Sequence, residues 1–141
     1  MLGMKKYPKK YIESCRTKID ECIALYEKAA KTLPREFESS YFNNLILVLD
    51  HMFEHRLRTV EGKDGNPLNE VRVLCNSLLL NGGKLQVDHL PGWPNSAVSG
   101  LKLPAEKSVL KLKKGDKINL SASDFIKLTD SFFEELKKKF L

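Results

Sequence analysis

The sequence predicts a mainly α-helical fold, a four-helix bundle-like domain with a small β-hairpin before the last helix. Apolar residues recur at intervals of three and four in four separate segments, which is the spacing of one face of an α-helix. Residue types that start and stop helices flank these segments. A length of 141 residues suits one helical domain over residues 1–141, in which residues 84–120 form a loop and β-hairpin insert.

Two of the expected helices precede a glycine-rich bend at residues 61–67. Pro8 suits a first helical position, and the apolar repeat after it predicts a helix that ends before Pro34. A second helix begins near Arg35 and is expected to extend to Leu57. Its apolar side chains cover an arc of about 200° at 100° per residue. An arc this wide predicts a central helix with neighbours on both sides.

Two more helices are expected after the bend. Asn66 is a good N-cap and Pro67 suits the first turn of a third helix, which the glycines at 82–83 terminate. Ser121 and Asp124 have the spacing of a capping box. They predict the start of a fourth helix whose apolar face is rich in phenylalanine.

The segment between these two helices lacks a helical period. Residues 84–104 carry prolines around Trp93 and predict a loop or lid. Apolar residues alternate with polar ones at 109–112 and 117–120, on either side of the turn residues 113–116. This pattern predicts a small β-hairpin that leans on the helices.

Composition and charge restrict the classes of partner. The chain has 42% apolar and 30% charged residues, as a folded protein does, and its net charge is +6 with the basic excess at the two ends. A basic surface can attract nucleic acid or an acidic partner. Lysines along amphipathic helices are more often a solvated face, and no helix-turn-helix, zinc-finger or RNA-binding signature accompanies them. Nucleic-acid binding is therefore disfavoured.

Cysteine usage and the apolar runs predict a cytoplasmic protein. Cys15, Cys22 and Cys75 fall among apolar residues of helical patterns, so we expect reduced, buried thiols, with Cys75 packed and inert rather than nucleophilic. The N-terminus lacks the pattern of a signal peptide. The longest strongly apolar run, residues 45–49, is too short to cross a bilayer, so no membrane partner is expected.

A histidine pair provides the sharpest chemical motif. The run from His51 to His55 resembles the His-x-x-Glu-His motif of inverted zinc peptidases, with Glu54 as the acidic member. Two histidines four apart on a helix can bind one divalent metal, and Asp50 or His89 could complete the ligand set. The peptidases need a larger domain with a mixed sheet, which this chain lacks. Histidines at the edge of a helix's apolar face are also common without any metal.

The bend is a second candidate site. Arg56 and Arg58 face the expected start of the third helix, whose free N–H groups and cap residue Asn66 suit an anion such as phosphate or carboxylate. Internal pairing of the arginines is the more common arrangement. The acidic residues available for it are Glu61, Asp64 and Glu70.

Residues 55–72 resemble a run found in small bacterial helical proteins that are uncharacterised. The resemblance covers about residues 37–83 and the C-terminal end of the chain. It implies a bacterial, cytosolic protein, and it carries no known activity and no site residue.

The sequence as a whole predicts a non-enzymatic helical module that binds a protein partner or itself as a homodimer. The expected contact surface is an exposed helix face or the loop of residues 84–104, with Trp93 as an anchor. No nucleotide-binding loop or serine-hydrolase motif is present, and the catalytic residues are unknown. The alternative is a metal-binding bundle or metal-dependent hydrolase that uses His51 and His55.

Overall fold

The computed structural model describes residues 3–87, 90 and 101–141, and this part of the chain is mainly helical. It contains two isolated β-bridges but no β-sheet. The helices, in chain order, are α1 (Lys9–Ala29), the 3₁₀ turn η1 (Ala30–Thr32), α2 (Arg35–Met52), α3 (Arg58–Glu61), α4 (Pro67–Leu80) and α5 (Ala122–Phe140).

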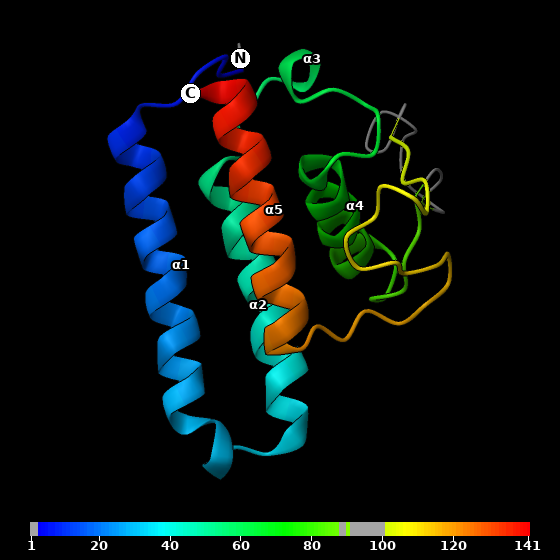
Figure 1. Cartoon of the computed structure of the whole chain (residues 1–141). Coiled ribbons are helices and arrows are strands. Elements are labelled where there is room, and N and C mark those ends of the chain that lie inside the picture. The colour runs from blue at the N-terminus through cyan, green and yellow to red at the C-terminus, as the bar shows by residue number, and fades with distance from the viewer. Residues whose placement is uncertain (1–2, 88–89, 91–100) are drawn as a thin grey trace.

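Helices α2 and α5 pack side by side, with α1 on one side of this pair and α4 on the other (Figure 1). Helix α2 contacts α1, α4 and α5. This is the central position that its wide apolar arc predicts. One side of α2 stays exposed at Asn44, Val48 and His51.

The core between the helices is rich in aromatic rings. The ring of Phe53 lies 5.1 to 5.9 Å, between centroids, from the rings of Tyr7, Tyr11, Phe132 and Phe133. Edge-to-face contacts of this kind add to the stabilisation from apolar burial. The fully buried phenylalanines are Phe42, Phe53, Phe125, Phe132 and Phe140.

The predicted helix starts are confirmed to within one residue, since Pro8 directly precedes the first helical position that it suits. Helix α1 begins one residue after Pro8, which serves as its N-cap. The Asn66 side chain caps α4, and Pro67 is the first helical residue. At α5, Ser121 and Asp124 form both hydrogen bonds of a capping box.

The predicted end of the second helix is wrong, because α2 ends at Met52 rather than Leu57. The chain leaves the helix at Phe53, whose φ of −128° and ψ of 31° turn its ring into the core. The following residues pair with the N-terminal segment instead of continuing the helix. The amide of Met4 donates to the carbonyl of His55 at 2.6 Å, and the amide of Leu57 donates to the carbonyl of Met4 at 2.9 Å.

The predicted β-hairpin is also wrong, since no strands form in residues 101–141. The turn at 113–116 exists, but its flanks do not pair with each other. Residues 115–118 form backbone hydrogen bonds with residues 83–85 instead. The amide of Gly115 donates to the carbonyl of Leu85 at 2.8 Å, and the amide of Leu85 donates to the carbonyl of Asp116 at 2.9 Å. The backbone of residues 115–118 therefore pairs with the segment that follows α4 rather than within a local hairpin.

The predicted loop at 84–104 lies partly outside the described residues, and Trp93 is among those left out. Leu85, Leu90 and Leu101 are buried, so the described parts of the segment contribute to the core. Among the described helices, none is long and apolar enough to span a membrane.

Candidate functional site

A buried carboxylate, that of Glu61, is the centre of a polar cluster at the bend between α2 and α4. Glu61 is the last residue of α3 and has no exposed surface. Arg56 donates from Nε to Oε1 at 2.8 Å, and Arg72 donates to Oε1 at 2.7 Å and to Oε2 at 3.2 Å. Asn69 donates to Oε2 at 2.6 Å. Two arginines and one amide thus compensate a charge that would be costly to bury alone.

The pKa of Glu61 reflects two opposed effects. Burial raises the pKa, because it disfavours the charged form. Hydrogen bonds from Arg72 and Asn69, together with the charges of Arg56 and Arg72, have the larger combined effect and hold the pKa of Glu61 below its ordinary value. Glu61 is therefore ionised at neutral pH and acts as a member of a structural ion pair.

Arg56 joins several elements through a fully buried guanidinium group. It donates to the carbonyl oxygens of Phe53 at 3.1 Å and Leu68 at 3.2 Å. Its Nη1 atom lies 2.9 Å from Oδ1 of Asp50, and its Cζ atom lies 5.7 Å from the ring centroid of Phe132. The charge of Arg56 is directed at groups of the protein itself.

The other two residues predicted to hold an anion differ from each other. The Asn66 side chain is occupied by capping, since its oxygen accepts from the amides of Leu68 at 2.9 Å and Asn69 at 3.3 Å. Arg58 has a buried Nε atom with no hydrogen-bond partner in the described part of the chain. Burial lowers the pKa of Arg58. Arg58 is thus the one predicted anion ligand whose Nε donor stays unused within that part.

The sequence also allows the bend arginines to pair with acidic residues of the bend. Arg56 and Glu61 form such a pair, but not every acidic residue named as a partner does so. Glu70 accepts instead from the Ser108 hydroxyl at 3.1 Å and from the amides of residues 109–110 at 2.7 and 3.0 Å. This carboxylate therefore holds a distant loop against α4. The bend is a structural joint with its charges directed inward.

Arg72 and Asn69 complete the Glu61 cluster. The sequence places both near the bend but predicts no individual role for either. They lie three residues apart on α4 and so share one face of that helix. The signal for their role is an amide and a basic residue three apart on a helix that follows an acidic residue in a glycine-rich bend.

The two histidines do not share a helix. His51 lies in the last turn of α2, whereas His55 lies in the turn that follows it. The carboxylate of Glu54 stands between them, 3.2 Å from Nδ1 of His51 and 3.3 Å from Nε2 of His55. The two imidazole side chains are 75% and 52% exposed, so both face solvent rather than a closed site.

No group of three or more His, Cys, Asp or Glu side chains that could hold a metal ion occurs in residues 3–87, 90 and 101–141. Asp50, one of the additional ligands named above, is paired with Arg56. The other, His89, lies outside the described residues. Metal binding by the histidine pair stays a prediction.

The cysteines are free thiols, and Cys15 and Cys75 are buried. The Sγ atom of Cys75 lies 3.5 Å from the carbonyl oxygen of Ile46. Burial raises the pKa of the Cys75 thiol well above its ordinary value. A thiol held in its protonated form inside the core is a poor nucleophile, in agreement with the packing role predicted for it.

Two apolar hollows open where α1 packs against α2, with volumes of about 280 and 330 Å³. Hydrogen bonds across this contact lie beside them, from Tyr11 to the carbonyl of Met52 at 2.5 Å and from Tyr41 to the carbonyl of Cys22 at 2.9 Å. The N-terminal hollow is lined by Met4, Tyr7, Pro8, Tyr11, Met52 and His55. The second hollow is lined by Cys22, Phe37, Ser40, Tyr41, Asn44, Leu45 and Val48.

No family model, curated protein or solved structure matches this chain. The Glu61 carboxylate at the bend has its hydrogen bonds within the protein, and the histidine pair is open to solvent. The apolar hollows beside α1 are the surface features that most resemble a binding site.

Proposed function

We propose that this protein is a non-enzymatic, four-helix bundle-like module that acts by binding protein, with a second copy of the chain as its partner. The proposal includes that the protein is bacterial and located in the cytoplasm, as the sequence implies. The function would lie in assembly, through surfaces of α1 and α2, rather than in a chemical reaction.

The distribution of exposed apolar side chains supports this proposal most directly. Exposed apolar groups on a folded protein mark surfaces of interaction when they are contiguous. Met4 and Tyr11 line one of the two apolar hollows, and Phe37 and Val48 line the other. Among the described residues, α5 has no large apolar side chain in the exposed class, and α4 has one, Leu79. Most of the others belong to α1, α2 and the segment before them. This α1–α2 apolar set consists of Met4, Tyr11, Leu25, Phe37 and Val48.

The arrangement of polar groups supports a non-enzymatic role. Arg56, Glu61 and Arg72 at the bend are engaged in structural ion pairs, and the Cys75 thiol is protonated and enclosed. A catalytic centre needs an acid, base or nucleophile that a substrate can reach. The accessible histidines share one carboxylate, that of Glu54, and their side chains are 75% and 52% exposed, so no enclosed site surrounds them.

The charge pattern of α1 favours an identical partner over a different one. Its outer face carries both lysine and glutamate side chains, including Lys10, Glu13, Lys18 and Glu21. A surface with both signs of charge can complement a second copy of itself, whereas the net charge of +6 opposes unspecific self-association.

Sedimentation analysis from low to high micromolar concentration tests the proposal. We expect a reversible rise in mean mass from monomer to dimer. The double variant Leu25→Glu/Val48→Glu should shift this rise to higher concentration, because it introduces charge into the apolar set. Leu79→Glu places the same charge on an exposed apolar position of α4 and is the control for each of the two substitutions; it should behave like the wild type. A strict monomer over the whole range would contradict the proposed function.

Metal binding, the alternative from the sequence, is tested separately. The favourable observation is the proximity of Glu54 to both imidazoles, and the unfavourable one is their exposure. We expect added zinc to leave the melting temperature unchanged, since a ligand stabilises only if it binds the folded state. A rise in melting temperature that His51→Ala removes would favour the alternative.

A further inference from the structure

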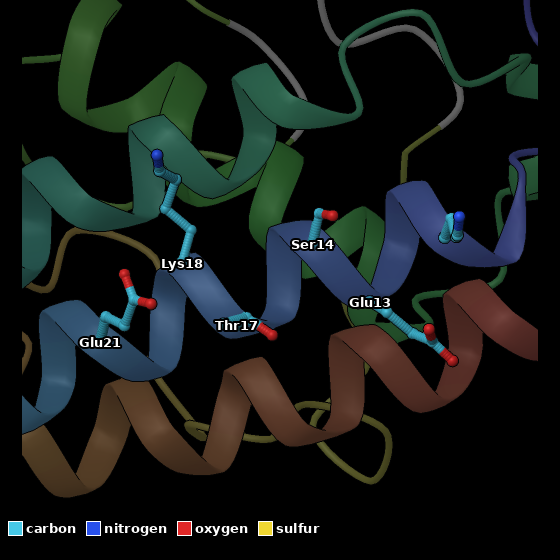
Figure 2. A pocket seen from close by; sticks show the side chains of 6 residues that line it. Glu13, Ser14, Thr17, Lys18 and Glu21 are labelled. Atoms are coloured by element: carbon cyan, nitrogen blue, oxygen red, sulfur yellow. The ribbon is translucent and has the colours of Figure 1, made fainter.

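The outer face of α1 forms an open hollow whose lining has an internal symmetry. Its lining residues are Lys10, Glu13, Ser14, Thr17, Lys18 and Glu21. In Figure 2, Ser14 and Lys18 lie on the side of α1 next to α2, whereas Glu13 and Thr17 lie on the side next to α5. The face is polar throughout, and its centre carries only the two small residues Ser14 and Thr17.

The symmetry becomes clear from the midpoint of this face, which lies between Cys15 and Arg16. Ser14 and Thr17 are equally far from it on opposite sides, and so are Lys10 and Glu21. Lys10 and Glu21 are about three turns apart, so they lie on one line along the helix, each about 8 Å from the midpoint.

A second α1 placed antiparallel on this face would therefore match it. Twofold symmetry would set Lys10 of each copy opposite Glu21 of the other, which gives two ion pairs. The small side chains of Ser14 and Thr17 would allow the helices to approach closely at the centre. In the described part of the chain, neither Lys10 nor Glu21 forms an ion pair within its own copy, so both are available.

The ends of α1 are complementary as well. Leu25 is 65% exposed and lies about 14 Å beyond the midpoint. The N-terminal hollow lies in the other direction: Tyr11, which lines it, is about 7 Å from the midpoint, and the hollow continues past the first residue of α1 to Tyr7 and Pro8. Leu25 lies seven residues, about two turns, from Lys18, which is on the side of α1 next to α2 (Figure 2). The N-terminal hollow opens on that same side, where Tyr11 donates to the carbonyl of Met52. In the antiparallel pair, Leu25 of one copy would therefore enter the apolar hollow of the other.

We propose that two copies of the chain form a symmetric dimer through antiparallel pairing of α1, with Lys10 against Glu21 and Leu25 in the N-terminal hollow. This inference rests on the proposed self-association and specifies its geometry. The contact covers little more than one helix face, so the dimer is reversible and weakens at high salt.

Charge reversal provides the decisive experiment. Lys10→Glu alone sets like charges against each other twice in the dimer, and so does Glu21→Lys. Each should raise the dimer dissociation constant at least about tenfold in sedimentation equilibrium. The double variant Lys10→Glu/Glu21→Lys restores opposite charges and should return the dissociation constant to within a few-fold of the wild type.

Mixing the two single variants provides a second readout. A substitution that only destabilised its own chain could not produce the expected result. A Lys10→Glu copy carries two glutamates at the paired positions, and a Glu21→Lys copy carries two lysines. An equimolar mixture should therefore form a heterodimer although each variant alone dimerises poorly. The controls Lys137→Glu and Glu134→Lys make the same changes of net charge on exposed positions of α5 and should leave the dimer intact.

The outcomes separate the two proposals. A wild-type dimer that persists in both single charge variants, yet is weakened by Leu25→Glu/Val48→Glu, would overturn the antiparallel α1 geometry and leave the proposed function standing. Failure of the mixed variants to form a heterodimer would also overturn the geometry. A wild type that never dimerises would overturn both.

Discussion

The Nε atom of Arg56 lies 2.8 Å from Oε1 of Glu61, and both side chains are completely enclosed. This pair closes the bend that carries the chain from α2 through α3 to α4. Lys139 of α5 reinforces it by donating from Nζ to the carbonyl oxygen of Glu61 at 2.8 Å. The bend and the C-terminal helix are thereby joined at one residue.

Replacing Glu61 with glutamine should destabilise the protein strongly. The change keeps the shape of the side chain but removes the buried carboxylate that Arg56 and Arg72 share, so that, within the described part of the chain, Arg56 retains only its ion pair with Asp50. Removing one partner of a buried ion pair costs roughly 3 to 5 kcal/mol, and we expect a loss in this range by urea unfolding. Glu134→Gln, on the exposed side of α5, is the control and should change the free energy of unfolding by less than about 0.5 kcal/mol. A similar effect of both substitutions would contradict the structural role of Glu61.

The same carboxylate should make stability sensitive to acid. The pKa of Glu61 is lowered in the folded state relative to its ordinary value of 4.5, so the folded state favours the ionised form. Its contribution is complete above the unfolded-state pKa and is lost as the pH falls through the lower folded-state pKa. Between neutral pH and this acidic range, the unfolding free energy of Glu61→Gln should therefore decline less than that of the wild type. Parallel curves for the two proteins would argue against this assignment.

Adjacent residues of α2 should respond very differently to truncation. Leu49 is fully buried, and Leu49→Ala should cost roughly 2 to 5 kcal/mol because it removes apolar contacts and leaves a cavity. Val48 is 45% exposed, and Val48→Ala should cost well under about 1 kcal/mol. Chemical denaturation of both variants measures the difference. Equal losses of unfolding free energy in the two variants would contradict the burial of Leu49 and the exposure of Val48 on α2.

Glu70 should control the order of the loop that follows residue 107. Its carboxylate accepts from the Ser108 hydroxyl and from the amides of Val109 and Leu110. In Glu70→Ala we expect faster hydrogen exchange at these two amides, because their acceptor is lost. Amides in the middle of α1 provide the internal reference and should lose protection only through the overall change in stability. Unchanged exchange at Val109 and Leu110 would show that other groups hold the loop.

The positions where helices begin were predictable because their causes are local. An asparagine that caps its own helix and a proline in the first turn act within three residues of each other, as do Ser121 and Asp124. These signals do not depend on the rest of the fold. The same holds for the helical period of α5, whose phenylalanine and leucine side chains are buried.

The end of α2 was not predictable in this way, since the apolar repeat continues to Leu57. Burial of Phe53 among rings from α5 and the N-terminal segment outweighs the one further helical turn that the local pattern favours. The histidine motif was affected by the same event. His55 leaves the helix, so the spacing that suggested a metal site describes the sequence but not the local geometry.

From its amino-acid order alone, this chain determined its helical class, the central place of α2 and the residues that start its helices. These properties follow from periodicity and from hydrogen bonds between near neighbours. Only the tertiary structure decided which charges meet at Glu61, where residues 115–118 bond, and which apolar side chains on α1 and α2 remain exposed. These contacts join groups that are far apart in the sequence. Their burial and pairing energies arise only when the helices are packed together.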